Sequence, residues 1–293
     1  MKILDALRAA AETLEKAGID DALADAEILT WHAADIDRLT AFLDNPETNS
    51  QTLARIRRLT TRRAKGEPVQ YIVGQVEFCG LEITVGKGVL IPRPETELLV
   101  EEAVKTVTHE PLNVQYANKK NSLAILDLCT GSGCIALALA KEFRGAKVIG
   151  TDISPKALYY ARKNISRNHI GNVTFMKGSL FGPVKKGTKF DLITANPPYI
   201  INSEISELQR EVKDWEPTGA LDGGDDGLDF YREILSKAGR YLKPDGSLIL
   251  ELGYGQARAI AEISSRNGFK VVSIIRDLAG IERILKATSA VVS

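Results

Sequence analysis

The sequence has few of the residues that build covalent or metal-held frameworks: its 293 residues include only three cysteines and three histidines. The cysteines, Cys79, Cys129 and Cys134, form no CxxC pair, and the histidines show no HExxH spacing. This odd, scattered set argues against a disulfide framework and a zinc site, and it fits a reducing compartment. We therefore expect chemistry that requires no metal.

The chain also lacks net charge and long apolar runs. Lysine plus arginine and aspartate plus glutamate both number 38, which argues against a large basic cleft and against direct binding of nucleic acid. No apolar stretch approaches the roughly 18 residues of a membrane span. Acidic residues interrupt the apolar pattern of residues 1–20, unlike a targeting peptide. The sequence thus predicts a cytoplasmic protein with no membrane partner.

Hydrophobic periodicity predicts an N-terminal helical region, because apolar residues recur there at helical spacing. Ser50 is the expected cap of a helix that ends at Ala64. Gly66-Glu67-Pro68 then breaks the helix, and a hairpin is expected within residues 76–85. A chain of this length predicts two domains. The predicted division is a helical domain of residues 1–69, a β-hairpin connector of residues 70–87 and a larger domain of residues 88–293.

From Leu123 onward the pattern changes to alternating strands and helices, which is typical of an α/β protein with a mostly parallel, Rossmann-like sheet. Helices are expected at residues 134–143, 155–168, 228–242 and 256–267. Strands are expected at residues 124–128, 147–151, 173–177, 190–195 and 247–252, followed by a closing antiparallel pair at residues 270–276 and 281–287. The polar, turn-rich residues 109–122 are expected to form a loop.

The chain is organised around Asn196-Pro197-Pro198-Tyr199, which directly follows the apolar strand of residues 190–195. Two prolines stop the strand because neither can donate a backbone hydrogen, and their fixed φ angles hold the neighbouring carbonyls rigid. Asn196 therefore lies at the carboxyl end of a strand, where open α/β sheets bind ligands. An amide, a rigid carbonyl and a ring can grip a planar –NH2 group. The pattern indicates a methyl-acceptor site, with a simple strand terminator as the alternative.

A glycine-rich loop joins the first sheet strand to its helix, and Asp152 ends the next strand, where an acid can accept hydrogen bonds from both hydroxyls of a ribose. The spacing of the loop also fits the dinucleotide fingerprint, so the loop alone leaves NAD and S-adenosylmethionine open. Asp127 precedes the loop, where it would repel a pyrophosphate but suit an ammonium and a sulfonium. With an acceptor site and no hydride chemistry, S-adenosylmethionine is favoured. The loop residues are Cys129, Thr130, Gly131, Ser132 and Gly133.

Taken together, the motifs resemble the HemK/PrmC family, class I S-adenosylmethionine-dependent methyltransferases that act as protein-(glutamine-N5) methyltransferases of peptide-chain release factors. NPPY is shared with adenine-N6 methyltransferases, whereas PRPETE and EPxxALxGGxDGL are far more specific. The similarity covers nearly the whole chain. It includes GEPVQYIVG from Gly66, VLIPRPETELLV from Val89, DLCTGSGCIALALA from Asp127, FDLITANPPYI from Phe190, WEPTGALDGGDDGLDFY from Trp215 and LELGYGQ from Leu250.

The resemblance implies a helical substrate-docking domain, a methyltransferase domain and roles for single residues. Cys129 to Gly133 would line the cofactor, and Asp152 would hold its ribose. Ser179-Leu180 stand where relatives often have an acid and an aromatic residue, and both Ser179 and Leu180 would border the adenine. That departure would remove a carboxylate acceptor for the exocyclic amine and a stacking partner for the ring.

For the substrate, the resemblance implies that Asn196, Pro197, Pro198 and Tyr199 hold the glutamine, with Asn196 also near the cofactor. The Asn196 side-chain oxygen and the Pro197 carbonyl would accept the two amide hydrogens and aim the nitrogen at the methyl group. These two residues are the expected catalytic pair. The expected partners are class I release factors, and the expected role is support of translation termination.

Two charged stretches leave alternatives open. The basic run within residues 55–65 is either a solvated helix face or a contact for an RNA- or ribosome-associated partner. Arg93, Glu95 and Glu97 either serve a site or tune a helix start. Two rival functions also remain: an adenine-N6 methyltransferase of RNA or DNA that uses the basic run, and a nucleotide-binding protein without chemistry. The run comprises Arg55, Arg57, Arg58, Arg62, Arg63 and Lys65.

Overall fold

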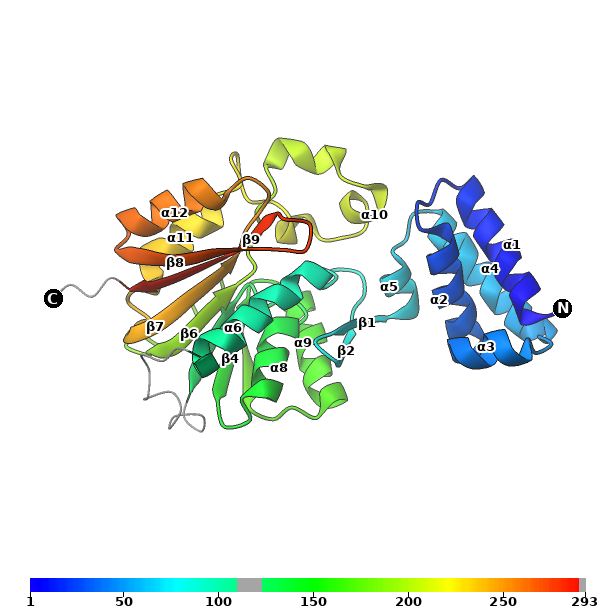
Figure 1. The fold of residues 1–293 in the computed structure, drawn as a ribbon, viewed down its shortest axis with the longest axis horizontal. Coiled ribbons are helices and arrows are strands. Elements are labelled where there is room, and N and C mark those ends of the chain that lie inside the picture. The colour runs from blue at the N-terminus through cyan, green and yellow to red at the C-terminus, as the bar shows by residue number, and fades with distance from the viewer. Residues whose placement is uncertain (110–122, 290–293) are drawn as a thin grey trace. The chain divides into compact units, whose positions relative to one another are not determined.

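The computed structural model describes residues 1–109 and 123–289, so the loop expected at residues 109–122 falls almost entirely outside the described residues (Figure 1). The chain falls into two compact units. None of the described helices is long and apolar enough to cross a bilayer. The first unit comprises residues 1–75, 85–87 and 208–216, and the second comprises residues 76–84, 88–207 and 217–293.

The first unit is a bundle of short helices whose apolar faces pack together. Its elements are α1 (Ile3–Lys16), α2 (Ala22–Ala34), α3 (Arg38–Asp44), α4 (Ser50–Ala64) and α5 (Val69–Val73). Ile3, Leu14 and Leu29 are fully buried in its core. The predicted cap of α4 was wrong by one residue. Asn49 has an extended backbone and its side chain accepts a hydrogen bond from the Thr52 N–H at 2.8 Å, so Ser50 is the first helical residue.

A segment far along the chain completes this bundle. Residues 208–216, which include α10 (Arg210–Lys213), belong to the first unit. Arg63 is buried, and its guanidinium contacts Asp25 and Glu211, each at 2.5 Å. Because a buried guanidinium is costly unless carboxylates satisfy it, this pairing holds the segment to α2 and α4.

The second unit contains a seven-stranded sheet in the order β5-β4-β3-β6-β7-β9-β8. The first five strands in that order run parallel, β9 runs antiparallel to β7, and β8 runs antiparallel to β9. The Rossmann-like sheet with a closing antiparallel pair is therefore confirmed. Its strands are β3 (Ala124–Leu128), β4 (Lys147–Asp152), β5 (Val173–Lys177), β6 (Phe190–Ala195), β7 (Leu242–Glu251), β8 (Phe269–Arg276) and β9 (Glu282–Ser289).

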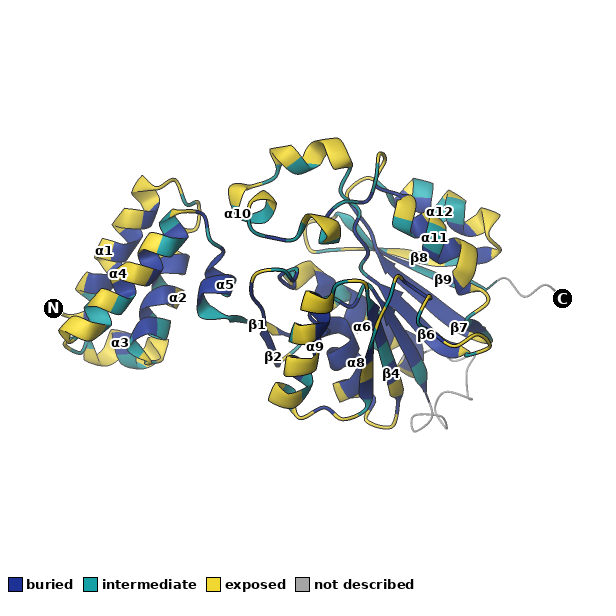
Figure 2. Ribbon diagram, turned by 180° about the vertical axis from the view of Figure 1, so that it is seen from behind, coloured by how far each residue is buried: buried dark blue, intermediate teal, exposed yellow. Residues whose placement is uncertain are grey.

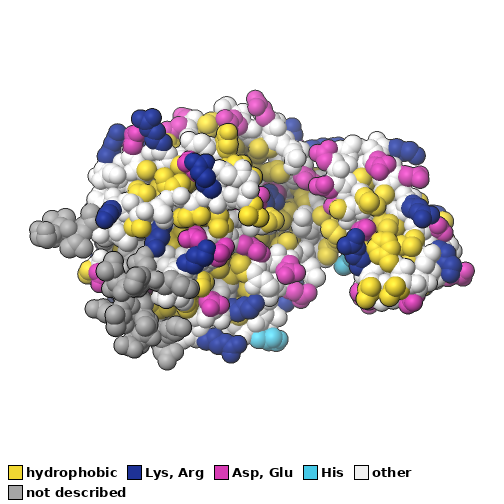
Figure 3. All heavy atoms as spheres, in the orientation of Figure 1, with side chains coloured by type: hydrophobic (Ala, Val, Ile, Leu, Met, Phe, Trp, Pro, Cys, Tyr) yellow, Lys and Arg dark blue, Asp and Glu magenta, His cyan; other side chains and the backbone are white. Residues whose placement is uncertain are grey.

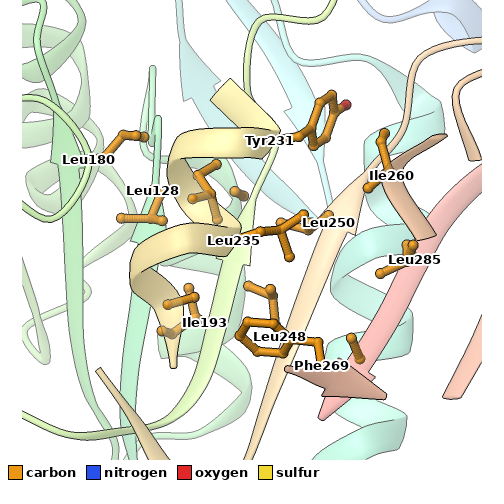
Figure 4. Close-up of a cluster of buried hydrophobic side chains, with 14 of the residues drawn as sticks. Leu128, Leu180, Ile193, Tyr231, Leu235, Leu248, Leu250, Ile260, Phe269 and Leu285 are labelled. Carbon is orange, nitrogen blue, oxygen red and sulfur yellow. The ribbon is translucent and has the colours of Figure 1, made fainter. Parts of the chain in front are cut away.

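Helices cover both faces of the sheet (Figure 1). Helices α6 (Glu97–His109), α8 (Cys134–Glu142) and α9 (Pro155–Asn168) lie on one face, and α11 (Asp229–Ala238) and α12 (Ala257–Arg266) lie on the other. The central strands β3 and β6 are almost wholly buried, while the outer helix faces are exposed (Figure 2). Between the sheet and α11 and α12, leucines and isoleucines of both layers pack together with Tyr231 and Phe269 (Figure 4).

The helix predicted at residues 228–242 was too long, since α11 ends at Ala238. The Tyr241 carbonyl accepts the Phe190 N–H at 2.8 Å, and Leu242 pairs with Phe190 as β7 begins. Pairing with a neighbouring strand therefore prevails over the helical pattern. The predicted hairpin forms from β1 (Gln75–Phe78) and β2 (Leu81–Thr84). The Asn164 side chain of α9 hydrogen-bonds both the N–H and the carbonyl of Thr84.

Candidate functional site

A cavity of about 430 Å³ opens at the carboxyl ends of the parallel strands in the second unit. Each of four successive strands contributes residues to its wall, at its carboxyl end or just after it. They are Cys129 and Gly131 after β3, Asp152 at the end of β4, Ser179 and Leu180 after β5, and Asn196 and Pro198 after β6. These seven residues, all expected at cofactor or substrate, thus line one cavity, because parallel strands bring their carboxyl ends to one edge.

Other expected residues support the wall from behind. The Thr130 N–H donates to the Thr151 carbonyl at 3.0 Å, and the Ser132 carbonyl accepts from the Asn164 amide. Gly133 caps α8 with φ +81°, and a Cβ there would lie 2.6 Å from Phe175. Only glycine fits this position, so the loop can fold tightly between β3 and α8.

Asp152 presents a carboxylate to the cavity that two backbone groups hold in place. Its Oδ2 accepts the Gly131 N–H and its Oδ1 accepts the Ser154 N–H, both at 2.8 Å. Burial raises the pKa of this carboxyl, and the two backbone hydrogen bonds act in the opposite direction. Each oxygen keeps a lone pair, so the carboxylate can still accept hydrogen bonds from a ligand that carries two neighbouring hydroxyls.

Asp127 does not line the cavity, although the sequence suggested that it meets a cationic ligand there. It is fully buried, and its carboxyl accepts hydrogen bonds from the hydroxyls of Thr130 at 2.5 Å and Thr194 at 2.8 Å. Burial raises its pKa to about 7, against the effect of these two hydroxyls. Asp127 therefore fixes the loop from beneath, where β3 and β6 lie side by side.

The wall of the cavity also contains two residues that the sequence did not predict. Phe230 and Glu233 of α11 line the same cavity. They are three positions apart on one helix, so they share a face. A ring and a carboxylate are the two groups that Ser179-Leu180 do not provide. The helical pattern predicted α11, but only the folded sheet brings this face to the cavity.

The Asn196 to Tyr199 segment is held by motifs that are distant in sequence. The Gln256 amide donates to the Tyr199 carbonyl at 2.9 Å. A Cβ at Gly227, which has φ +73°, would lie 2.4 Å from that same carbonyl. Ile200 forms a parallel bridge with Asp222. The glycine-rich stretch from Trp215 and the LELGYGQ stretch therefore position the Asn196 to Tyr199 segment. This contact gives both sequence motifs a structural role.

The Asn196 side chain has two buried neighbours that the sequence did not predict as site residues. Its Nδ2 lies 3.3 Å from the Thr96 hydroxyl. Glu251, at the end of β7, is 2% exposed and has Thr96 and Asn196 as hydrogen-bonding neighbours. Thr96 stands inside the PRPETE stretch and Glu251 inside LELGYGQ, so both motifs are visible in the sequence but the contact between them is not.

Residues around Thr96 have other partners. The Glu97 carboxyl accepts the Cys79 N–H at 2.7 Å, which anchors the turn of the hairpin to the start of α6. Glu95 is exposed and lines a separate cavity beside Leu278 at the β8–β9 turn. Of the expected charged trio, Glu97 thus has a structural contact of its own.

The basic run of α4 does not form one charged face. Arg63 is buried with its two carboxylates, and Arg62 pairs with Glu67. The Arg55 guanidinium donates to the Ala33 carbonyl at 3.2 Å. Within this run only Arg57, Arg58 and Lys65 are exposed. At most half of the run can therefore form a solvated helix face or contact an RNA- or ribosome-associated partner.

The sequence matches two family models, the PrmC N-terminal domain over residues 5–74 and a methyltransferase domain over residues 119–284. It is 44% identical to the release factor glutamine methyltransferase of Thermodesulfovibrio yellowstonii over 97% of each chain. It is also 44% identical to the enzyme of the same name from Geobacter sulfurreducens, over 97% of this chain and 94% of that one.

Among solved structures, the hMettl16 catalytic domain in complex with the MAT2A 3'UTR hairpin 1 superposes with a TM-score of 0.56. Its identity is 16%, over 86% of this chain and 85% of that chain. The T. thermophilus 16S rRNA N2 G1207 methyltransferase, in complex with AdoMet and guanosine, gives a TM-score of 0.50 at 18% identity, over 73% and 49% of the two chains. At this identity the structures share the methyltransferase fold alone.

Proposed function

This chain belongs to the release factor glutamine methyltransferase family, and from that premise we propose that it methylates the glutamine side chain in the Gly-Gly-Gln loop of class I peptide-chain release factors. The methyl donor is S-adenosylmethionine, and the product supports translation termination in the cytoplasm. The observation that carries the proposal is the placement of the Asn196 amide and the Asp152 carboxylate on one cavity.

The cavity suits the proposed cofactor. Asp152 offers a carboxylate for the ribose hydroxyls, Leu180 and Phe230 offer apolar surface for the adenine, and Glu233 offers an acceptor for its exocyclic amine. Cys129 to Gly133 form the tight loop against which the rest of the cofactor would lie. When bound, S-adenosylmethionine supplies an electrophilic methyl group on a sulfonium.

Asn196 and Pro197 would orient the acceptor nitrogen. A carboxamide nitrogen is a poor nucleophile because its lone pair is delocalised into the carbonyl. We propose that the Asn196 Oδ1 and the Pro197 carbonyl accept its two hydrogens, which aims the nitrogen and favours the charge that develops on it. Pro198 and Tyr199 complete the grip on the glutamine. No proton has to leave the nitrogen before the methyl group moves.

The rival function is methylation of adenine N6 in nucleic acid, which also presents a planar –NH2 group. Family membership over almost the full chain favours the protein glutamine. The structure also weakens the rival argument from charge, since half of the basic run is engaged within the helical unit.

A direct test gives the purified protein labelled S-adenosylmethionine with three acceptors: a class I release factor, the same factor with its loop glutamine replaced by alanine, and naked RNA or DNA. We expect label on the intact release factor only, with a mass increase of one methyl group at that glutamine. Label on nucleic acid, or undiminished label on the alanine variant, would overturn the proposal in favour of the rival.

We also propose that the helical domain of residues 1–69 docks the substrate, because Asn196 and its neighbours read only a planar –NH2 group. Two exposed surfaces of the helical unit are candidates. One is the pair Arg57 and Arg58. The other is an apolar patch over α2 and α3, where Leu39 and Leu43 are 68% and 75% exposed (Figure 3).

Charge reversal of Arg57 and Arg58 to glutamate is expected to raise the apparent KM for the release factor severalfold, and less at high salt. The affinity for S-adenosylmethionine should not change. Arg8→Glu, at an exposed position of α1, is the matched control and should behave like the wild type. Initial rates at two salt concentrations measure the effect. A KM that responds to Leu39→Ser and Leu43→Ser but not to the reversals would assign docking to the apolar patch instead.

A further inference from the structure

Glu251 is a buried carboxyl for which the mechanism above has no use. The parallel register of β6 and β7 pairs Ala195 with Leu250. The next residue along each chain segment, Asn196 in one and Glu251 in the other, therefore lies beside its counterpart. The Tyr231 hydroxyl donates to the Glu251 backbone carbonyl at 2.8 Å, which fixes the end of β7 against α11. Burial of an ionisable carboxyl costs free energy unless neighbouring groups pair or hydrogen-bond with it.

The donors and acceptors that these groups carry determine the direction of the hydrogen bonds between them. An ionised carboxylate accepts hydrogen bonds and donates none. The Thr96 hydroxyl has one hydrogen, so when that hydrogen goes to Glu251, its oxygen is left to accept from the Asn196 Nδ2 at 3.3 Å. The Oε2 atom of Glu251 has no partner within hydrogen-bond distance in the described part of the chain, so it keeps an acceptor site. Both features suit a nitrogen, and not an oxygen, on the buried side of the Asn196 amide.

We propose that Glu251, acting through Thr96, is a positioning residue that fixes the orientation of the Asn196 amide. With Nδ2 held on the buried side, Oδ1 must face the cavity, where it can accept a hydrogen of the substrate nitrogen. In the opposite orientation, the –NH2 group of Asn196 would face the –NH2 group of the substrate, so that two donors would meet. This inference deepens the proposed glutamine methylation and rests on it.

The charges around Glu251 make this arrangement sensitive to pH. Glu95 of the PRPETE stretch disfavours the ionised form, Arg283 of β9 favours it, and Tyr199 and Tyr231 face it from the Asn196 segment and from α11. Arg283 is already paired with Asp277 at 3.0 Å. Burial is the largest effect and raises the pKa of Glu251 to about 7.

The direction of the pH effect follows from which form is the acceptor. Below its pKa, Glu251 is protonated and can donate to the Thr96 oxygen, so Thr96 is free to donate to the Asn196 Oδ1 and the amide loses its fixed orientation. Turnover should therefore fall as the pH drops below about 7, by up to about tenfold per pH unit.

A double-mutant cycle tests the coupling. Glu251→Ala, Asn196→Ala and the double variant are compared by kcat at saturating release factor and S-adenosylmethionine. We expect Glu251→Ala to lower kcat by about tenfold or more, yet to have almost no further effect once Asn196 is alanine. The affinity for S-adenosylmethionine should stay within about threefold in all variants. Effects that simply multiply would show that Glu251 acts independently and would overturn the proposal.

An isosteric change guards against loss of folding. Glu251→Gln keeps the shape and removes the titration, so its kcat should lose the fall below about pH 7. Glu282→Gln on β9, where the carboxylate pairs with Arg276 of β8, is the matched control and should keep the wild-type profile. An unchanged acid limb in Glu251→Gln would overturn the proposal. If wild-type label falls on nucleic acid, only the proposed substrate fails, and the same cycle then applies to the adenine –NH2 group.

Discussion

Replacement of Asn196 by alanine is expected to lower the turnover number by about 100-fold or more, because the acceptor nitrogen loses the group that aims it. Many other residues line the cofactor cavity, so the affinity for S-adenosylmethionine should change much less. Single-turnover measurements with a release factor separate the two quantities, since they report the methyl-transfer step and not the release of product.

The matched control for this change is Asn267→Ala, which removes an asparagine at the exposed end of α12. It should retain wild-type turnover. An Asn196→Ala enzyme with a nearly normal single-turnover rate would mean that the two prolines after it only end β6, and that the acceptor nitrogen is held elsewhere.

The second large effect is expected at Asp152. Its replacement by alanine should weaken S-adenosylmethionine binding by roughly 1.5–3 kcal/mol, the scale of hydrogen bonds to a charged group. This corresponds to roughly a 10- to 150-fold higher dissociation constant. The N–H groups of Gly131 and Ser154 lose their acceptor in the same variant, so the loop after β3 should also loosen.

Calorimetry with S-adenosylmethionine and with NAD measures this effect. Asp152→Asn keeps one acceptor oxygen and should give an intermediate affinity, which separates the ligand contact from the loss of loop support. Asp20→Ala, in the exposed turn after α1, is the control and should bind as the wild type does. Unchanged affinity in Asp152→Ala, or tighter binding of NAD than of S-adenosylmethionine, would contradict the cofactor assignment.

The sequence predicted those parts of the fold that local pattern determines. Alternating apolar segments from Leu123 gave the strands and most helices of the sheet, because one face of each element must be buried. The failures occurred where distant contacts decide. The Tyr241–Phe190 hydrogen bond ends α11 early, and the Arg63–Glu211 ion pair draws residues 208–216 into the helical unit. Neither contact leaves a periodic signal.

The same distinction applies to the site. Asp152 and Asn196 were predictable because each lies at the carboxyl end of a strand, and these strand ends meet at one edge of a parallel sheet. Glu251 also lies at the end of a strand, but its role depends on β6 and β7 being neighbours, which periodicity does not give. Thr96 and Phe230 lie on helical elements, so only the packing of those elements determines what they face.

The interleaved path of the chain limits how this enzyme can be recombined with its relatives. Because the helical unit includes residues 208–216 as well as residues 1–75 and 85–87, a chimera with a single crossover near residue 75 would join Arg63 of one parent to position 211 of the other. Unless that parent also has a carboxylate there, a buried guanidinium would lose one of its two partners. Exchange of the helical unit between relatives therefore requires the transfer of all three segments together.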